Sequence, residues 1–404
     1  MSSELLTFYA PTIILTAMLT YLFCFILGSA LGLFASEFAD RWGCTQKYRS
    51  PMPKKIFITI LSGIAAAWLY WWEVENLMLM PAGMPQIRVF SVSEAFNIYA
   101  VFVQRYILHL ILFTFLLAAT LTDFYEMIIP DTITVVGTVF ALFVAVLFPA
   151  SALPVTQYSF FADEFGLTIV ESISVPMHLW SPIQIHGFSF LTITFLWWFW
   201  CFAMLDRVWY VKLPFRKANA IFWRYLYRSP RTKYIIAAAL IAPVCIAFVH
   251  PPLFKAFPSG SAAALCSALT GMAAGMILVW SVRLVAQWVL GVEAMGFGDV
   301  TLMGMIGAFL GWQAVLLVFF IAPFFGLVYG IVNVLLGRGR AVPYGPFLCL
   351  ATAVVVVAWR PIWSATAEYF AFGIGTIGLA LLVLLVLFGV LLSLVHKLLA
   401  GLRR

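Results

Sequence analysis

Long hydrophobic runs separated by short polar segments dominate this chain of 404 residues. A transmembrane helix needs about 20 mostly apolar residues. On that template we expect spans near residues 10–35, 56–72, 99–119, 132–149, 189–205, 234–250, 262–282, 312–335, 346–359 and 372–396. A shorter apolar run, 300–311, indicates a shallow or half-length helix and brings the total to about eleven. The pattern predicts an all-α, polytopic transmembrane helical bundle.

Composition supports this fold class and excludes others. The chain is 64% hydrophobic and only 10% charged, whereas soluble domains are roughly 45–50% apolar and about 25% charged. These figures exclude a disordered chain, a disulfide scaffold and a nucleic-acid-binding domain, so no nucleic-acid partner is expected. The six cysteines form no CxxC pair. We therefore predict neither a metal site nor a cofactor.

The net charge of +7 reports the orientation of the helices. Lys and Arg gather on the cytoplasmic side of membrane proteins. With eleven crossings, the basic segments 36–55 and 206–233 fall on one side together with most other cations. This predicts an outer N-terminus and a cytoplasmic C-terminus. We interpret the cations of 206–233 as topology determinants that also contact anionic membrane lipid.

Two aspartates have settings that favour chemistry. Asp123 ends the third predicted span, and Asp299 directly precedes the half-length helix. On this topology both lie at the cytoplasmic mouth of the membrane, where a carboxylate is costly unless it is paired or hydrated. Two carboxyl groups that share a site do not both ionise easily. One then acts as acid and the other as base around one water molecule, as in aspartic peptide hydrolysis.

The glycines beside Asp299 fit the same hypothesis, although a simpler interpretation stays open. Gly296 and Gly298 remove side chains, which lets backbone or an extended substrate approach closely. Alternatively, Asp299 only caps its helix and the glycines loosen a turn. Asp131 is interpreted first as a residue whose negative charge satisfies the backbone N–H groups at the start of its helix, with substrate positioning as the alternative.

Three segments carry a resemblance to a known family. Residues 123–134 (DFYEMIIPDTIT) resemble the first catalytic block of the prepilin peptidases, also called type IV leader peptidases. Residues 295–312 (MGFGDVTLMGMIGAFLGW) resemble the second block, which has a GxGD core. Residues 343–348 (PYGPFL) resemble the block that follows. The three blocks occur in order on one predicted face.

The resemblance implies an integral-membrane aspartic endopeptidase of the bacterial inner membrane. Its substrates are precursors of type IV pilins or of type II secretion pseudopilins, which have a basic leader before a hydrophobic helix. The family cuts on the cytoplasmic side. Asp123 and Asp299 match the two catalytic aspartates. The supporting or substrate-positioning residues would be Gly296, Gly298, Asp131, Pro130 and Glu126. For Glu126 we expect a solvated position in a cytoplasmic loop rather than a catalytic role.

The chain departs from the family pattern in two ways. Many relatives also methylate the new N-terminus and have paired CxxC motifs in the first cytoplasmic loop. Here that loop has only Cys44, and Gly32 stands where the family has asparagine. We therefore consider methyltransferase activity doubtful. The aspartates also lie 176 positions apart (299 minus 123), farther than is usual for the family.

This spacing suggests a division of the chain into five consecutive parts. They are an N-terminal membrane module with a degenerate first loop (1–98), the first half of the core (99–149), an insertion with two extra spans (150–261), the second half of the core (262–360), and an additional C-terminal helix with a basic tail (361–404).

Two other functions fit the aspartate pair. An ion-coupled membrane transporter would use the two carboxylates as a cation site. A GxGD protease of another kind would cut within the bilayer. It fits less well, because the segment after Asp123 contains the Ile-Ile-Pro-Asp extension that is characteristic of the leader-peptidase block. Among the remaining polar residues, His109 is expected to be hydrogen-bonded in the core, and Arg105 to reach the outer interface. The pairs Gly271/Gly275 and Gly326/Gly330, and the glycines after Asp299, predict close helix packing.

Overall fold

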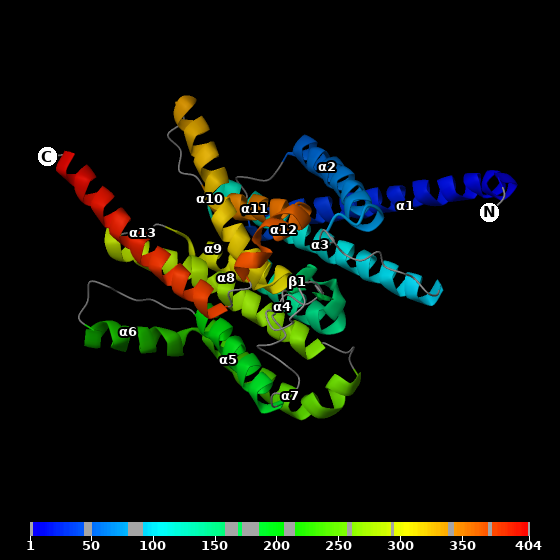
Figure 1. The fold of residues 1–404 in the computed structure, drawn as a ribbon. Helices are drawn as coiled ribbons and strands as arrows, with labels where there is room; N and C mark the ends of the chain where they lie inside the picture. Colours follow the sequence, from blue (N-terminus) through cyan, green and yellow to red (C-terminus); the bar gives the residue numbers. More distant parts are fainter. Residues whose placement is uncertain are drawn as a thin grey trace.

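The computed structural model describes residues 3–43, 51–79, 92–157, 169–171, 186–205, 215–256, 261–291, 295–337, 343–370 and 374–402. Its α-helices are α1 (Ser3–Phe38), α2 (Met52–Tyr70), α3 (Val92–Glu126), α4 (Asp131–Leu147), α5 (His186–Met204), α6 (Phe215–Arg228), α7 (Pro230–Ala256), α8 (Ser261–Leu290), α9 (Phe297–Leu310), α10 (Trp312–Leu335), α11 (Gly345–Val357), α12 (Trp359–Phe370) and α13 (Ile374–Leu402). Figure 1 shows α1 and α2 beside α3, with α5, α6 and α7 on the other side of α8.

Short elements join some of these helices. Two π-helical segments, Ala39–Gly43 and Trp71–Glu75, extend α1 and α2, and a 3-10 turn covers Pro149–Ser151. Strands β1 (Val155–Gln157) and β2 (Ile169–Glu171) pair antiparallel, with Val155 opposite Glu171. The strands lie between α4 and α5 in the chain. Because both strands are only three residues long, the fold is still that of an α-helical bundle.

Each of the eleven predicted apolar segments contains a helix, so the all-α, multi-pass fold class is confirmed. Six described helices are long and apolar enough to cross a membrane. A seventh candidate combines α11 and α12, which are bent by 91° relative to each other. The predicted span 346–359 corresponds to α11 and ends at this bend. Three apolar helices, Asp131–Leu147, Leu191–Met204 and Phe297–Leu310, are shorter. The count of eleven crossings and the orientation stay predictions, as does the five-part division.

Two helices were not predicted as helices. α6 lies within the basic segment 206–233, which was interpreted as a loop. It was missed because its polar face interrupts every apolar run. α12 follows the bend after Val357. Both are amphipathic, and a hydropathy template for membrane spans does not detect helices of that kind.

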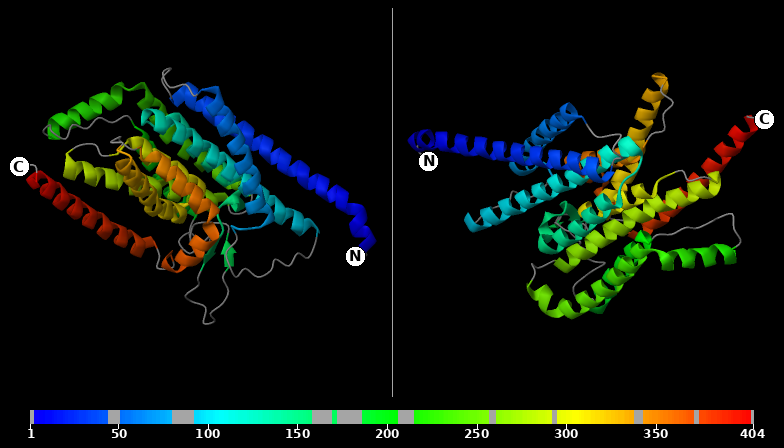
Figure 2. Two further views of the ribbon diagram at one scale, coloured as in Figure 1. Left: turned by 90° about the horizontal axis from the view of Figure 1, so that it is seen from above. Right: turned by 180° about the vertical axis from the view of Figure 1, so that it is seen from behind.

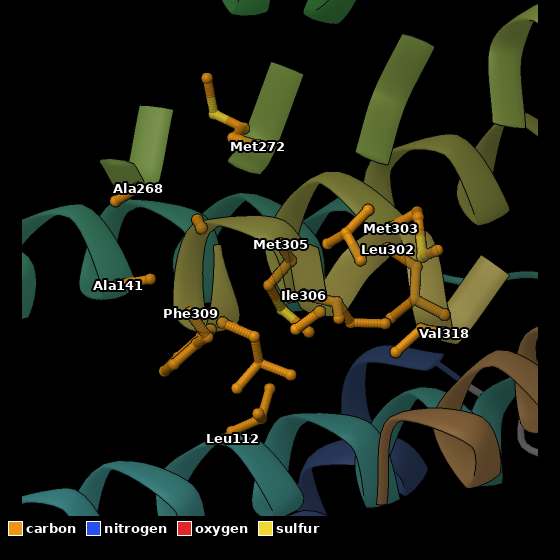
Figure 3. Close-up of a cluster of buried hydrophobic side chains, with 14 of the residues drawn as sticks. Leu112, Ala141, Ala268, Met272, Leu302, Met303, Met305, Ile306, Phe309 and Val318 are labelled. Carbon is orange, nitrogen blue, oxygen red and sulfur yellow. The ribbon is translucent and has the colours of Figure 1, made fainter. Parts of the chain in front are cut away.

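The centre of the bundle is the half-length helix α9. Its 14 residues give a length of about 21 Å, less than the roughly 30 Å of a bilayer core. From Asp299 to Leu310 every residue is buried. Figure 3 shows its side chains among Leu112 of α3, Ala141 of α4, Met272 of α8 and Val318 of α10. A helix that is apolar on all sides is stable only when it is surrounded in this way.

Glycines allow α8 and α9 to touch backbone to backbone. A Cβ atom on Gly307 would lie 2.0 Å from the carbonyl oxygen of Gly271, and one on Gly271 would lie 2.2 Å from the carbonyl oxygen of Gly307. The close packing predicted for these positions is confirmed. For Gly330 the prediction is wrong, because a Cβ there would meet no atom of the described residues within 4 Å.

A buried polar network joins the α2 extension to α3. His109 Nδ1 lies 2.7 Å from Glu73 Oε1, and both residues are almost fully buried. This confirms the hydrogen-bonded role predicted for His109. Arg105 is buried as well and donates to the carbonyl of Ala150 over 3.2 Å. The expectation that it reaches the outer interface is therefore wrong: the nearby charge of Glu73 and the Ala150 carbonyl hold it inside.

Replacing Glu73 by glutamine is expected to lower the free energy of unfolding by about 2 kcal/mol, because the buried Arg105 guanidinium loses its counter-charge. The matched control is Glu75→Gln, which changes an exposed carboxylate two residues away. Thermal unfolding of the purified chain in detergent measures both. Equal melting temperatures for the two variants would contradict a stabilising role for the buried charges of Glu73 and Arg105.

Candidate active site

Asp123 lies one turn before the end of α3. The helix stops at Glu126, and Met127 follows with a φ of 55°. The backbone N–H of Met127 donates to the carbonyl of Asp123 over 2.9 Å. A left-handed residue at this position is a common helix ending, although a side chain there costs about 1 kcal/mol. The turn redirects the chain, so that Ile129 packs inward beside the aspartate.

Asp299 is the third residue of α9, and Gly296 occupies the N-cap position. The Asp299 side chain accepts a hydrogen bond from the backbone N–H of Gly296. An acidic residue at the third helical position often reaches back in this way and satisfies an amide at the helix start. The interpretation of Asp299 as the cap of its helix is therefore wrong, because the N-cap residue is Gly296. The Asp299 carboxyl group instead accepts from the backbone N–H of that residue.

The fold buries the two aspartates together. Asp123 is 5% exposed and Asp299 is 7% exposed, and an electrostatic interaction couples their carboxyl groups. The buried thiol of Cys349 on α11 lies near both carboxyl groups. The backbone N–H of Gly345 donates to Asp123 Oδ2 over 3.0 Å. Three segments that are distant in the sequence therefore meet at one place: the end of α3, the start of α9 and the start of α11.

Ile129 fills the space between the two glycine-containing segments. A Cβ on Gly298 would lie 3.0 Å from the Ile129 Cβ, and one on Gly345 would lie 2.8 Å from Ile129 Cδ1. Gly298 thus admits the chain's own backbone. Around Gly296 the space is more open, since the nearest atom to a Cβ there is Asp299 Oδ2 at 3.7 Å. Among the described residues, Gly298 is thus closely packed and Gly296 is not.

Besides Cys349, three residues of this site were not among the predicted site residues: Ile129, Tyr344 and Gly345. All three lie inside the sequence blocks that carried the family resemblance. Tyr344 is half-buried before α11, and burial raises the pKa of its phenol, as does the negative charge of Asp299. The phenol therefore stays protonated at neutral pH and remains a hydrogen-bond donor beside the carboxyl pair.

The other predicted residues lie around the aspartates. Pro130 is the N-cap of α4, and Asp131 is the first helical residue, so its negative charge faces the positive end of the helix. Asp131 Oδ2 also forms an ion pair with Arg231 Nη2 over 2.6 Å. Glu126 is the half-buried last residue of α3. Substrate-positioning roles for these residues stay predictions.

The region on which the methyltransferase argument rests is described only in part. Cys44 lies outside the described residues. Gly28 and Gly32 belong to the contact between α1 and α2, where a Cβ on Gly32 would lie 2.4 Å from Ser62 Oγ. Among the described residues, no group of three or more His, Cys, Asp or Glu side chains is arranged to hold a metal ion.

Comparison with known proteins points to one family. Residues 231–331 match the model of the type IV leader peptidase family. This range includes Asp299 and its glycines, begins inside the predicted insertion, and leaves out Asp123. The predicted resemblance to the family is therefore confirmed over the stretch that contains the GxGD block.

Individual relatives agree with the family match. The chain is 36% identical over 90 residues to the prepilin leader peptidase/N-methyltransferase of Aeromonas salmonicida, a match that covers 22% of this chain and 31% of the relative. The protein of the same name from Burkholderia pseudomallei is 34% identical over 107 residues, 26% of this chain and 35% of the relative. For Pseudomonas aeruginosa the identity is 36% over 95 residues, 23% and 33% of the two chains. The chain thus spans about a third of the length of these curated relatives. No solved structure gives a significant match.

The contact between Gly345 and Asp123 leads to a prediction. A Cβ on Gly345 would lie 2.5 Å from Asp123 Oδ2, so Gly345→Ala should displace the carboxyl group. A displacement of about 1 Å costs up to roughly 100-fold in rate. We expect the rate of the reaction that uses Asp123 to fall about tenfold. The control is Gly326→Ala, where a Cβ meets only Phe347 at 3.6 Å. Unchanged activity of Gly345→Ala would show that this contact does not position Asp123.

Proposed function

We propose that the chain is an integral-membrane aspartic endopeptidase of the bacterial inner membrane. It removes the leader peptide of prepilin-like precursors at the cytoplasmic face. The observation that supports this most is the burial of Asp123 and Asp299 in one site, although they lie 176 positions apart in the chain. The names of the relatives supply the substrate class.

The arrangement fits hydrolysis by an activated water molecule. Because two neighbouring carboxyl groups share one proton, the ionised member takes a proton from water and the protonated member donates to the carbonyl oxygen of the scissile bond. The backbone N–H groups of Gly345 and Gly296 orient Asp123 and Asp299, respectively. The roles of base and acid belong to the pair and are not assigned to one aspartate each, because two coupled carboxyl groups titrate together.

Co-expression tests the proposal. The full chain is expressed with a precursor that has a basic leader followed by a hydrophobic helix, and the precursor's size is followed by immunoblot. A version of the precursor that lacks the leader serves as the size marker. We expect conversion to the size of the marker only when the chain is present. A precursor that stays full-length beside normal membrane levels of the chain would contradict the proposal.

Methyl transfer is not part of the proposed activity, although the relatives' names include it. The single cysteine of the first loop and Gly32 argue against it. We expect the mature product to have a free, unmethylated N-terminus. Mass spectrometry of the N-terminal peptide decides this, because a product heavier by one methyl group would show that the chain is bifunctional.

The transporter alternative makes a different prediction. An ion-coupled carrier would move its substrate into proteoliposomes, and this uptake would depend on the same two aspartates. For a peptidase we expect leader removal by the reconstituted chain and no aspartate-dependent uptake. Uptake without any leader removal would favour the carrier.

A further inference from the structure

The helix α6 stands apart from the proposed peptidase chemistry. Its exposed cations Arg216, Lys217, Arg224 and Arg228 lie within 14 residues that contain no acidic side chain. At 100° per residue these four positions fall on one side of the helix. The positive charge is thus displayed along a single face.

Apart from Asn219, the rest of the helix is apolar or aromatic. Phe222 and Leu226 lie opposite the cations, with Trp223 and Tyr225 at the two boundaries between the faces. Leu226 is buried and Phe222 is half-buried, whereas Trp223 is 60% exposed and Tyr225 is 48% exposed. The protein therefore covers the middle of the apolar face and leaves the aromatic rings at its two edges exposed. Aromatic rings between an apolar and a charged face are typical of helices that lie in the membrane interface.

The position of α6 agrees with an interfacial helix. In the left view of Figure 2, α6 runs across the direction of α3 and α13 at the end of the bundle where both of those helices terminate. The start of α7, directly after α6, is held at the same end as the aspartates by the ion pair between Arg231 and Asp131. Along α5 and α7, large apolar side chains such as Trp198 and Leu240 are exposed.

We propose that α6 lies in the membrane interface on the side of Asp123 and Asp299 and binds the headgroups of anionic lipids. Charge complementarity selects the occupant, since four cations without an acidic neighbour on the helix match a surface of phosphate groups. A water-soluble acidic partner would satisfy the cations but would leave Trp223 and Tyr225 in water. A lipid surface accommodates the cations and the exposed aromatic rings at once. Lipid binding by α6 is independent of the peptidase activity.

Lipid retention by the full chain tests this. The chain is extracted from vesicles of phosphatidylcholine and phosphatidylglycerol in equal amounts, and the retained lipids are quantified by mass spectrometry. We expect the wild type to be enriched in phosphatidylglycerol. The variant Lys217→Gln/Arg224→Gln/Arg228→Gln should lose at least half of this enrichment. The control Lys217→Arg/Arg224→Lys/Arg228→Lys keeps the charge and should retain it.

Two further measurements guard against misfolding. The single variants Arg224→Gln and Arg228→Gln alter exposed side chains and should each cause a smaller loss of phosphatidylglycerol, at an unchanged melting temperature. Raising the salt concentration during extraction should reduce the enrichment of the wild type more than that of the triple glutamine variant. Equal phosphatidylglycerol in the wild type and the triple glutamine variant would overturn the proposal. The proposal would also be overturned if the charge-preserving control lost the phosphatidylglycerol enrichment.

Discussion

Replacing Asp123 or Asp299 by asparagine is expected to abolish precursor cleavage, with a fall in rate of about 1,000-fold or more. Asparagine keeps the size of the side chain and removes the proton transfer. Because the two carboxyl groups are proposed to act on one water molecule, loss of either one should disable the site. The double variant should therefore be no worse than the more damaging single variant.

The matched control is Glu368→Gln, which neutralises an exposed carboxylate on α12. It should cleave at the wild-type rate. Initial rates are measured with purified chain in vesicles at equal protein levels. A normal rate for either asparagine variant would exclude the shared-water mechanism. A double variant that is much slower than both single variants would mean that the aspartates contribute separately.

The second large effect is expected at the contact between α8 and α9. In Gly307→Ala, the new methyl group would lie 2.0 Å from the backbone of Gly271, and neither backbone can move without separating the helices. Overpacking of this kind costs about 3 kcal/mol, more than the roughly 1 kcal/mol that alanine gains in helix propensity. Asp299 lies on the same rigid helix, so cleavage should fall together with stability.

The matched control is Gly330→Ala in α10. A Cβ at that position meets no atom within 4 Å, so only the gain in helix propensity remains. We expect a melting temperature in detergent that is unchanged or slightly higher for Gly330→Ala and several degrees lower for Gly307→Ala. Equal melting temperatures would show that α8 and α9 separate more easily than the backbone contact implies.

A helix could be predicted from the sequence where all of its sides are either buried or in contact with lipid. The apolar run 300–311 identified α9 and its short length, because a central helix is hydrophobic on all sides. The same criterion missed α6 and α12, whose polar faces break the run. The predicted span 346–359 covers α11 and stops where α12 begins, so the 91° bend between the two helices was not predicted, since hydropathy contains no information on direction.

At the site, the sequence indicated which groups have the chemistry but not what holds them. Asp123 and Asp299 stood out because charged residues are scarce in this chain. The partner of Asp123 is a backbone N–H, that of Gly345, which lies 222 positions away. A backbone donor is present at nearly every residue, so no side-chain pattern singles it out. Similarly, the position of Arg105 depends on Glu73 and Ala150, which are distant in the sequence.

The central claim is that Asp123 and Asp299 form one peptidase site. Its most direct test is mass spectrometry of a purified prepilin-like precursor after incubation with the purified chain in vesicles, in parallel with the Asp299→Asn variant. The account predicts two products from the wild type, the intact leader and the mature protein, and only uncut precursor from the variant. Uncut precursor with the folded wild type, or the same two products from the variant, would contradict it.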